Sequence, residues 1–190
     1  MSLLDINNTY TDKGTTHSYL ELYNRLLSPI KETAINVLEM GIGDFGFKNG
    51  GSLLLWRGFF TKATIHGIDI LPIDRVLEEL IHDSRVKLYC NTNGYNPEFI
   101  SNNFDNMKFD FLLDDGPHSL ESQKSFVELY SHLLSDNGIL IIEDVQSIEW
   151  LEILKNKTPE HLKQYIKTYD LRSVKGRYDD IVFTIDRLNV

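Results

Sequence analysis

Cysteine is almost missing from this sequence: Cys90 is the only one in 190 residues. A single cysteine excludes a disulfide within the chain and is typical of proteins from the reducing cytoplasm. Because Cys90 ends an apolar stretch, we interpret it as a small buried hydrophobic residue rather than a nucleophile. We therefore expect a cytoplasmic protein that depends on its hydrophobic core for stability.

Long apolar runs are missing too, and basic residues are outnumbered. No stretch approaches the roughly 20 apolar residues that a membrane-spanning helix requires, and the first ten residues do not have the pattern of a secretory signal. The chain has 19 Lys and Arg against 28 Asp and Glu, which gives a net charge of −9. This balance argues against nucleic acid or a membrane surface as a partner.

Linkers rich in proline or glycine, low-complexity segments and internal repeats are also absent. A chain of this length is sufficient for one domain with a substantial core. We therefore expect a single domain over residues 1–190.

The sequence does contain an alternation of strand-like and helix-like segments. The expected strands are 34–40, 64–68, 86–90, 109–114 and 138–143. The expected helices are 18–27, 52–60, 74–82, 97–102, 120–134 and 148–154. Such alternation predicts an α/β fold in which helices cover both faces of a mostly parallel sheet.

Two further strand-like runs, 163–171 and 180–186, follow without a helix-length gap between them. The short connection contains Gly176, which favours an antiparallel hairpin over a crossover helix. A parallel sheet that ends in such a hairpin is typical of the Rossmann-like class I methyltransferase fold, with seven strands. A dehydrogenase would continue with further βα units.

Acidic residues follow two of the expected strands. Asp114 and Asp115 begin the sequence Asp-Asp-Gly-Pro-His118, and Glu143 and Asp144 follow the next strand. Ligands of open α/β sheets bind at the carboxyl ends of the strands. Because carboxylates gathered there repel one another unless a cation or shared protons compensate, the pattern favours a hard-metal site with a histidine beside it.

A glycine loop follows the first expected strand. Glu39 precedes Gly41 and Gly43, and two glycines at this point let the loop approach a ligand closely. The third glycine of the dinucleotide pattern is absent and a long loop continues to Gly51, which suits a ligand without phosphates. Asp69 ends the second strand, where a carboxylate binds ribose hydroxyls or, alternatively, caps the next helix. Asn93 either contacts an adenine or shapes a turn.

Six motifs in this order resemble the macrocin/mycinamicin-type sugar O-methyltransferases, which are metal-dependent and use S-adenosylmethionine (SAM). The likeness runs from Thr11 to the closing hairpin, and its specific part is the Asp-Asp-Gly-x-His motif with the downstream Glu-Asp. The motifs are Thr11-Asp-Lys-Gly-Thr15, Glu39-Met-Gly-Ile-Gly43, Gly50-Gly-Ser-Leu53, Ile65-His-Gly-Ile-Asp69, Asp114-Asp-Gly-Pro-His118 and Glu143-Asp144.

The resemblance implies roles for individual residues and for the N-terminal part of the chain. His118 would be the general base, and residues 1–30 would form an arm and a helix that cap the cofactor site. The implied Mg²⁺ ligands are Asp115, Glu143 and Asp144. The implied SAM-binding residues are Lys13, Glu39, Gly41, Gly43, Asp69, Asn93 and Asp114. Thr92-Asn93 replaces the Asp-Gln that the family usually has after the third strand, and the auxiliary N-terminal domain of larger relatives has no counterpart here.

Structural explanations remain for several of these residues. His118 sits where a helix begins, Asp144 precedes a helix that it would cap, and Asp114 either faces the cofactor or stabilises the turn. We interpret the remaining histidines as structural or surface residues, because no carboxylates accompany them in the sequence. They are His17, His66, His82, His132 and His161.

The expected activity is methylation of a hydroxyl on a sugar or a glycosylated small molecule, with a saccharide or small molecule as the partner. Three alternatives are an NAD(P)-dependent oxidoreductase, a metal-dependent hydrolase that uses Asp115, His118 and Asp144, and a non-catalytic binding module. The sequence leaves open whether copies of the chain associate.

Overall fold

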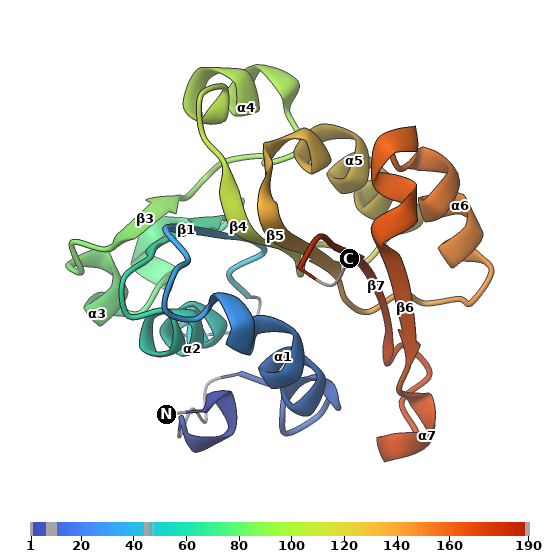
Figure 1. Ribbon diagram of the computed structural model, residues 1–190. Coiled ribbons are helices and arrows are strands. Elements are labelled where there is room, and N and C mark those ends of the chain that lie inside the picture. The colour runs from blue at the N-terminus through green and yellow to red at the C-terminus, as the bar shows by residue number, and fades with distance from the viewer. Residues whose placement is uncertain (1, 7–10, 44–45, 47, 189–190) are drawn as a thin grey trace.

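The computed structural model describes residues 2–6, 11–43, 46 and 48–188. In this part of the chain seven strands form one sheet with the order β3-β2-β1-β4-β5-β7-β6. Strand β7 is antiparallel to both of its neighbours, and the pairs among β1 to β5 are parallel (Figure 1). The strands are β1 (Asn36–Met40), β2 (Thr64–Ile68), β3 (Val86–Tyr89), β4 (Phe109–Asp114), β5 (Leu134–Ile142), β6 (Ile166–Asp170) and β7 (Ile181–Asp186). The predicted fold class, including the antiparallel hairpin, is confirmed.

Helices cover both faces of the sheet. One face carries α1 (Tyr19–Leu27), α2 (Gly51–Phe59) and α3 (Glu78–Ile81), and the other carries α4 (Pro97–Phe104), α5 (Leu120–Tyr130) and α6 (Trp150–Lys157) (Figure 1). The four-residue helix α7 (Arg172–Lys175) lies between β6 and β7. Short 3-10 helices complete the order: η1 (Leu3–Asp5), η2 (Ser28–Ile30), η3 (Ile73–Arg75), η4 (Ser131–Leu133) and η5 (Glu160–Tyr165).

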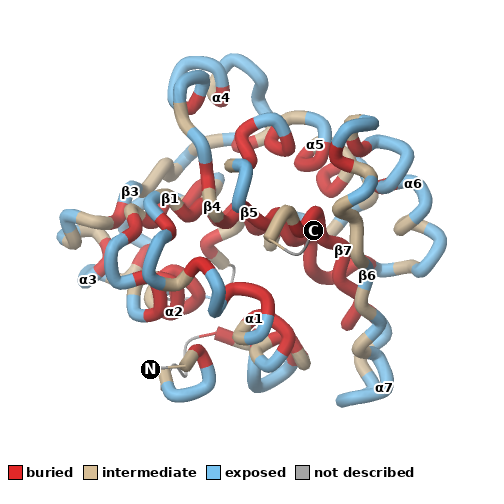
Figure 2. Tube along the Cα trace, viewed as in Figure 1, coloured by how far each residue is buried: buried red, intermediate tan, exposed pale blue. Residues whose placement is uncertain are grey.

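Two hydrophobic cores lie on the two sides of the sheet. Neighbouring strand residues point to opposite faces, so Val37 joins the core under α1 and α2 while Leu38 joins the core under α4 to α6. Because the central strands are apolar on both faces, they read as continuous hydrophobic runs in the sequence. Figure 2 shows these strands buried and the outer surfaces of the helices exposed.

Several predicted elements differ from the structure; the expected helix 120–134 ends at Tyr130, because η4 follows it and β5 already begins at Leu134. The expected helix 74–82 is interrupted at Val76, because Asn49 forms a parallel bridge with that residue and takes the neighbouring backbone hydrogen bonds. The interruption leaves η3 and the four-residue helix α3 in its place. The expected strand 163–171 is shorter, since its first residues belong to η5 and pairing with β7 begins at Ile166.

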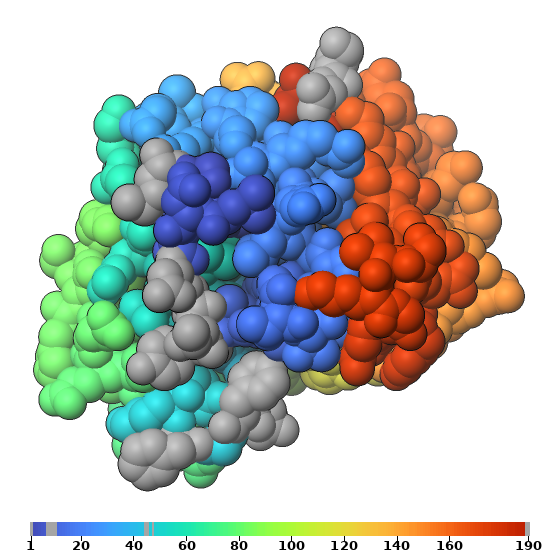
Figure 3. All heavy atoms as spheres, turned by 90° about the horizontal axis from the view of Figure 1, so that it is seen from below, coloured from blue at the N-terminus to red at the C-terminus, as the bar shows by residue number. Residues whose placement is uncertain are grey.

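The N-terminal segment, residues 11–27, lies against the connection between β6 and β7. Lys175 Nζ donates hydrogen bonds to the backbone carbonyls of Gly14, Thr15 and His17 at 2.7, 3.0 and 2.7 Å. Figure 3 shows the two segments side by side on the surface that α1 covers. None of the helices in the described residues has the length and apolar character needed to cross a lipid bilayer.

Candidate active site

The predicted acidic residues Asp114, Asp115, Glu143 and Asp144, here called the acidic cluster, lie at one edge of the sheet. Asp114 is the last residue of β4 and pairs with Met40 of β1 on one side and with Ile142 of β5 on the other. The three strands therefore end at the same level. Asp115 and the pair Glu143-Asp144 follow directly, as the hydrophobic pattern of the strands predicted.

A histidine and two carboxylates meet above these strand ends. His118 Nε2 lies 3.8 Å from Asp115 Oδ1 and 3.6 Å from Asp144 Oδ2. One ligand atom from each of the three residues falls within 4.8 Å of the others. Two carboxylate oxygens and an imidazole nitrogen at this spacing fit a divalent cation, since oxygen-rich donor sets suit Mg²⁺ and related ions. Burial raises the pKa of Asp144, and the nearby His118 opposes this shift.

The backbone at this site is unusual. His118 and Asp144 have φ angles of +53° and +52°, in the left-handed region that residues with a Cβ rarely occupy. Such conformations persist where the surroundings determine them, and they concentrate at functional sites. The helix-cap interpretation of Asp144 is wrong, because α6 begins five residues after Val145 and has Glu149 as its N-cap. His118 precedes Ser119, which caps α5.

Lys13 lies inside the acidic cluster and is fully buried. Its Nζ is 2.6 Å from Asp115 Oδ2, pairs with Glu143 Oε1, and lies 3.6 Å from Glu39 Oε1. Burial alone would lower the pKa of Lys13, but the three carboxylates raise it well above its usual range. The sequence resemblance placed Lys13 at the cofactor. The structure adds that its ammonium links Glu39, just before the glycine loop, to Asp115 and Glu143, which are predicted to bind metal.

Both oxygens of Glu143 have protein partners. Lys13 donates to Oε1 and the Tyr23 hydroxyl donates to Oε2. Burial and the nearby Asp115 raise the pKa of Glu143. Glu143 does not join the group of ligand atoms formed by Asp115, His118 and Asp144 among the described residues. Its role as a metal ligand stays a prediction.

The glycine loop contacts the acidic cluster directly. Gly41 has φ +92°, and a Cβ at this position would lie 1.9 Å from the carbonyl oxygen of Asp115. The Asp115 amide donates to the Met40 carbonyl at 2.8 Å. Gly43 also has a positive φ, of 131°. The two loops can approach this closely because Gly41 has no side chain, so the sites predicted for cofactor and metal are adjacent.

One oxygen of Glu39 has no hydrogen bond among the described residues and lies 3.6 Å from the Lys13 ammonium. Its Oε2 accepts hydrogen bonds from Ser52 Oγ at 2.8 Å and from Trp56 Nε1 at 3.0 Å. Within the described residues its Oε1 accepts none, although the side chain is fully buried. Burial raises the pKa of Glu39 to about 7. A buried acceptor that has an ion pair with Lys13 but no hydrogen bond retains room for a donor from a cationic ligand group.

Asp69 holds the glycine loop in place. Its Oδ2 accepts hydrogen bonds from the amides of Ile42 at 2.6 Å and Gly43 at 3.4 Å, and its Oδ1 accepts one from Leu71 at 2.9 Å. The alternative that Asp69 caps the following helix is wrong, because the short helix η3 has Pro72 as its N-cap residue. The predicted ribose contact stays a prediction.

Asn93 and Asp114 both stabilise turns. Asn93 Oδ1 accepts a hydrogen bond from the Tyr95 amide at 3.0 Å, which is the turn role considered from the sequence. Asp114 Oδ1 accepts one from the Tyr95 hydroxyl at 2.7 Å. Burial raises the pKa of Asp114 to about 7. Contacts of either residue with a cofactor stay predictions.

His17 was interpreted as a structural or surface residue because no carboxylates accompany it in the sequence, but the fold brings carboxylates to it. The side chain is buried, and its Nδ1 lies 2.7 Å from Asp180 Oδ1 and 3.3 Å from Asp144 Oδ1. No local pattern could reveal these contacts, because Asp144 and Asp180 are more than 120 residues away. The interpretation of His66 as structural agrees with its burial among aromatic rings.

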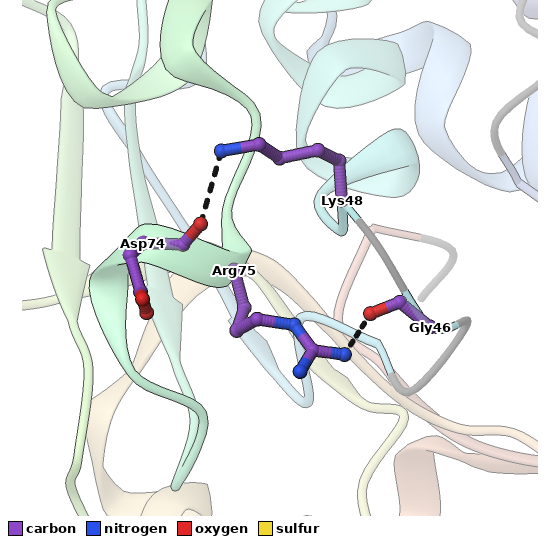
Figure 4. Close-up of a pocket in the computed structure, with 4 residues that line it drawn as sticks. All are labelled: Gly46, Lys48, Asp74 and Arg75. Atoms are coloured by element: carbon purple, nitrogen blue, oxygen red, sulfur yellow. Dashed lines mark hydrogen bonds between the residues drawn. The ribbon is translucent and has the colours of Figure 1, made fainter.

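A surface pocket of about 450 Å³ lies beside the glycine loop, on the side of η3 (Figure 4). Lys48 Nζ donates to the Asp74 carbonyl at 2.9 Å, and Arg75 donates to the Gly46 carbonyl. None of the clustered carboxylates lines this pocket. The position of the candidate chemistry therefore follows from the acidic cluster rather than from this pocket.

Sequence relatives of the chain are O-methyltransferases. It is 27% identical over 144 residues to the 8-demethyl-8-alpha-L-rhamnosyl tetracenomycin-C 2'-O-methyltransferase of Streptomyces olivaceus, which covers 74% of this chain and 36% of that protein. It is 30% identical over 148 residues to the mycinamicin VI 2''-O-methyltransferase of Micromonospora griseorubida, covering 72% and 34%. It is 31% identical over 140 residues to the demethylmacrocin O-methyltransferase of Streptomyces fradiae, covering 72% and 34%. The chain thus spans about a third of the length of these curated relatives. No protein-family model matches it.

Solved structures confirm the fold. The MycE methyltransferase from the mycinamycin biosynthetic pathway, in complex with Mg and S-adenosylhomocysteine (SAH), aligns with a TM-score of 0.73 at 22% identity, covering 98% of this chain and 54% of that chain. An O-methyltransferase from Bacillus cereus in complex with SAH aligns with a TM-score of 0.56 at 16% identity, covering 85% and 79%. The chain therefore has the Rossmann-like fold of class I methyltransferases and is a sequence relative of the macrocin- and mycinamicin-type O-methyltransferases, as its motifs predicted.

Proposed function

We propose that this chain is a Mg²⁺- and SAM-dependent O-methyltransferase that acts on a hydroxyl of a sugar or a glycosylated small molecule. The contact between Gly41 and Asp115 is the observation that carries this proposal, because it joins the glycine loop to the cation-binding group. A methyl donor in the loop and an acceptor near His118 would then be neighbours. The sequence relatives, whose names describe O-methylation, favour this activity over an oxidoreductase or a hydrolase.

The residues fit both groups that the activity requires. SAM would supply the methyl group as a sulfonium, and a divalent cation would lower the pKa of the acceptor hydroxyl. Glu39 would offer the oxygen that has no hydrogen bond to the cationic amino-acid part of SAM, and Asp69 lies beside the loop. The proposed SAM-binding residues remain Lys13, Glu39, Gly41, Gly43, Asp69, Asn93 and Asp114. The proposed cation ligands remain Asp115, Glu143 and Asp144.

His118 is the proposed general base. Its side chain is about one-third exposed (32%), while Asp115 and Asp144 lie close to its Nε2. An exposed imidazole beside a cation site can accept a proton from a hydroxyl that enters from solvent. The relatives' names include methylation of rhamnosyl and olivosyl compounds, so a deoxysugar hydroxyl is the first acceptor to test.

The N-terminal arm and helix, residues 1–30, are proposed to cap the cofactor site within a single domain of residues 1–190. The contacts of Lys13 with Glu39 and Asp115 support this arrangement. The cytoplasmic location expected from the single cysteine, and any association between copies of the chain, stay predictions.

The test is to measure SAM and SAH binding by calorimetry and methyl transfer from radiolabelled SAM to glycosylated acceptors. We expect SAM but not NAD⁺ to bind, and turnover to require Mg²⁺. Asp115→Asn should abolish turnover and leave SAM affinity near that of the wild type, whereas Asp136→Asn, at an exposed residue paired with Arg187, should change neither. Binding of NAD⁺ in preference to SAM, or turnover that persists in EDTA, would contradict the proposal.

A further inference from the structure

The two carboxylate oxygens of Asp144 face different parts of the protein. Oδ2 lies 3.6 Å from His118 Nε2, on the side of the proposed cation site. Oδ1 faces the N-terminal segment, where the Tyr19 hydroxyl donates a hydrogen bond to it and His17 Nδ1 lies 3.3 Å away. The direction of Oδ2 is therefore set by the partners that Oδ1 has on the opposite side.

Tyr19 contacts both the side chain and the backbone of Asp144. Its hydroxyl donates to Oδ1 and also accepts a hydrogen bond from the Asp144 amide at 3.3 Å. The backbone of Asp144 is in the left-handed region, at φ +52°. Gln123 Nε2 donates a hydrogen bond to the backbone carbonyl oxygen of Asp144 at 3.3 Å. A strained residue with so many partners is held by them, and Tyr19 and His17 are the ones that reach Oδ1 of its carboxylate.

The Tyr19 ring is itself fixed by its neighbours. It stacks between His17, with ring centroids 4.9 Å apart, and Tyr23, with centroids 5.7 Å apart. All three side chains are buried. A hydroxyl on a ring packed in this way has little freedom to move, so it can define where Asp144 Oδ1 lies.

His17 connects Asp144 to the C-terminal part of the chain. Its Nδ1 lies 2.7 Å from Asp180 Oδ1, and Asp180 is fully buried just before β7. Asp179 also approaches His17 and Asp144, but both of its oxygens accept hydrogen bonds from Arg177 at 3.1 and 2.9 Å. Because Arg177 occupies both oxygens of Asp179, this second acidic group is better explained as a scaffold for Asp144 than as another cation site.

We propose that Tyr19 and His17 are positioning residues that turn Asp144 Oδ2 towards Asp115 and His118 and so create the divalent-cation site. This inference rests on the proposed cation site and goes beyond it, because it assigns the geometry of that site to the N-terminal segment. Partners of metal ligands orient them, and removing such a partner lowers metal affinity about 10- to 100-fold.

The experiment measures Mn²⁺ affinity from the electron paramagnetic resonance signal of the free ion, with Mg²⁺ as competitor, in the full chain without SAM. Tyr19→Phe removes only the hydroxyl, and we expect it to weaken Mn²⁺ binding about 10- to 100-fold. Tyr130→Phe is the matched control, since it deletes another buried hydroxyl, which donates to the Gly94 carbonyl at 2.7 Å. It should lower stability by a similar amount and leave Mn²⁺ affinity unchanged.

A second pair of variants keeps the test decisive if Tyr19→Phe does not fold. His17→Leu removes the donor and should weaken Mn²⁺ binding, whereas His17→Asn retains a nitrogen donor near the Nδ1 position and should largely restore it. Wild-type affinity in both Tyr19→Phe and His17→Leu would overturn this inference alone. If the wild-type protein binds neither ion, the proposed cation site fails and the inference fails with it.

Discussion

Lys13 Nζ lies 2.6 Å from Asp115 Oδ2, although 102 residues separate them in the sequence. The same ammonium reaches Glu143 and Glu39, so one buried positive charge faces three carboxylates. One positive charge does not balance three carboxylates, so the rest must be compensated by bound protons or by a further cation. Lys13 therefore acts as an internal counterion that joins the glycine loop to the proposed cation site.

Lys13→Met should strongly destabilise the protein at pH 7. Removing one partner of a buried ion pair leaves the other charges without compensation, which typically costs about 3–5 kcal/mol of unfolding free energy. Urea denaturation measures this loss. Lys175→Met is the matched control, because Lys175 Nζ contacts backbone carbonyls rather than carboxylates and its loss should cost less.

The loss of unfolding free energy in Lys13→Met should become smaller as the pH falls. Without the ammonium, the buried carboxylates have pKa values in the folded state that are raised above their unfolded values. The folded state then binds more protons than the unfolded state, so stability falls as pH rises and recovers as pH is lowered. A destabilisation that is the same at pH 5 and pH 8 would argue against Lys13 as their counterion.

The sequence predicts most of the sheet because the central strands are buried on both faces. The bounds of β2 and β4 agree with the expected ranges 64–68 and 109–114, since an acidic residue marks the end of each: Asp69 directly follows β2, and Asp114 is the last residue of β4. Predictions failed where tertiary contacts override local pattern. The expected helix 74–82 is broken by the bridge between Asn49 and Val76, which are distant in the sequence.

In the candidate site, too, local pattern predicts some residues, and tertiary contacts alone reveal others. Asp115, His118 and Asp144 could be identified because each follows a strand end or the turn after it, where local pattern is informative. The contacts of Lys13 with Asp115 and Glu143, and those of His17 with Asp144 and Asp180, could not, since these carboxylates are more than 100 positions away. Only packing of the N-terminal segment against the sheet reveals them.

Gly41→Ala should destabilise the protein and disturb the site. The substitution places a Cβ 1.9 Å from the carbonyl oxygen of Asp115, which is backbone and cannot rotate away. The φ of +92° adds about 1–2 kcal/mol of strain for a residue with a Cβ. We expect a loss larger than this strain alone in urea denaturation, together with weaker SAM and Mn²⁺ binding.

Gly176→Ala separates the strain from the collision. Gly176 also has a positive φ, of 76°, but a Cβ there would meet nothing within 4 Å among the described residues. The unfolding free energy of Gly176→Ala should fall only by the strain of the positive φ, and the variant should bind SAM and Mn²⁺ like the wild type. Equal losses in the two variants would show that the Gly41–Asp115 contact does not constrain the fold.

His118→Ala should lower turnover about 10²- to 10⁴-fold, the usual contribution of a general base. Part of the rate should return at high pH, because an acceptor hydroxyl that is already deprotonated needs no base. Steady-state kcat between pH 6 and pH 10 measures this, with His82→Ala, at an exposed histidine, as the control. Rates equal to those of the wild type across this range would remove His118 as the base.

His66 should make the stability of the protein depend on pH. Burial lowers the pKa of His66 to about 4, and within the described residues its Nε2 has no hydrogen-bond partner. Between pH 6.5 and 4 the unfolded chain binds a proton at this residue that the folded chain does not. The contribution of neutral His66 to the unfolding free energy is therefore fully present above pH 6.5. It falls with decreasing pH, by up to about 1.4 kcal/mol per pH unit.

His66→Phe tests this dependence directly. Phenylalanine keeps a ring beside Tyr89, Phe104 and Phe109 but cannot bind a proton. The unfolding free energy of the variant, relative to the wild type, should rise as the pH is lowered from 7 to 5, while His82→Gln should show no such change. If the difference between His66→Phe and wild type is constant over this range, the folded protein must accommodate a charged His66, contrary to its apolar surroundings.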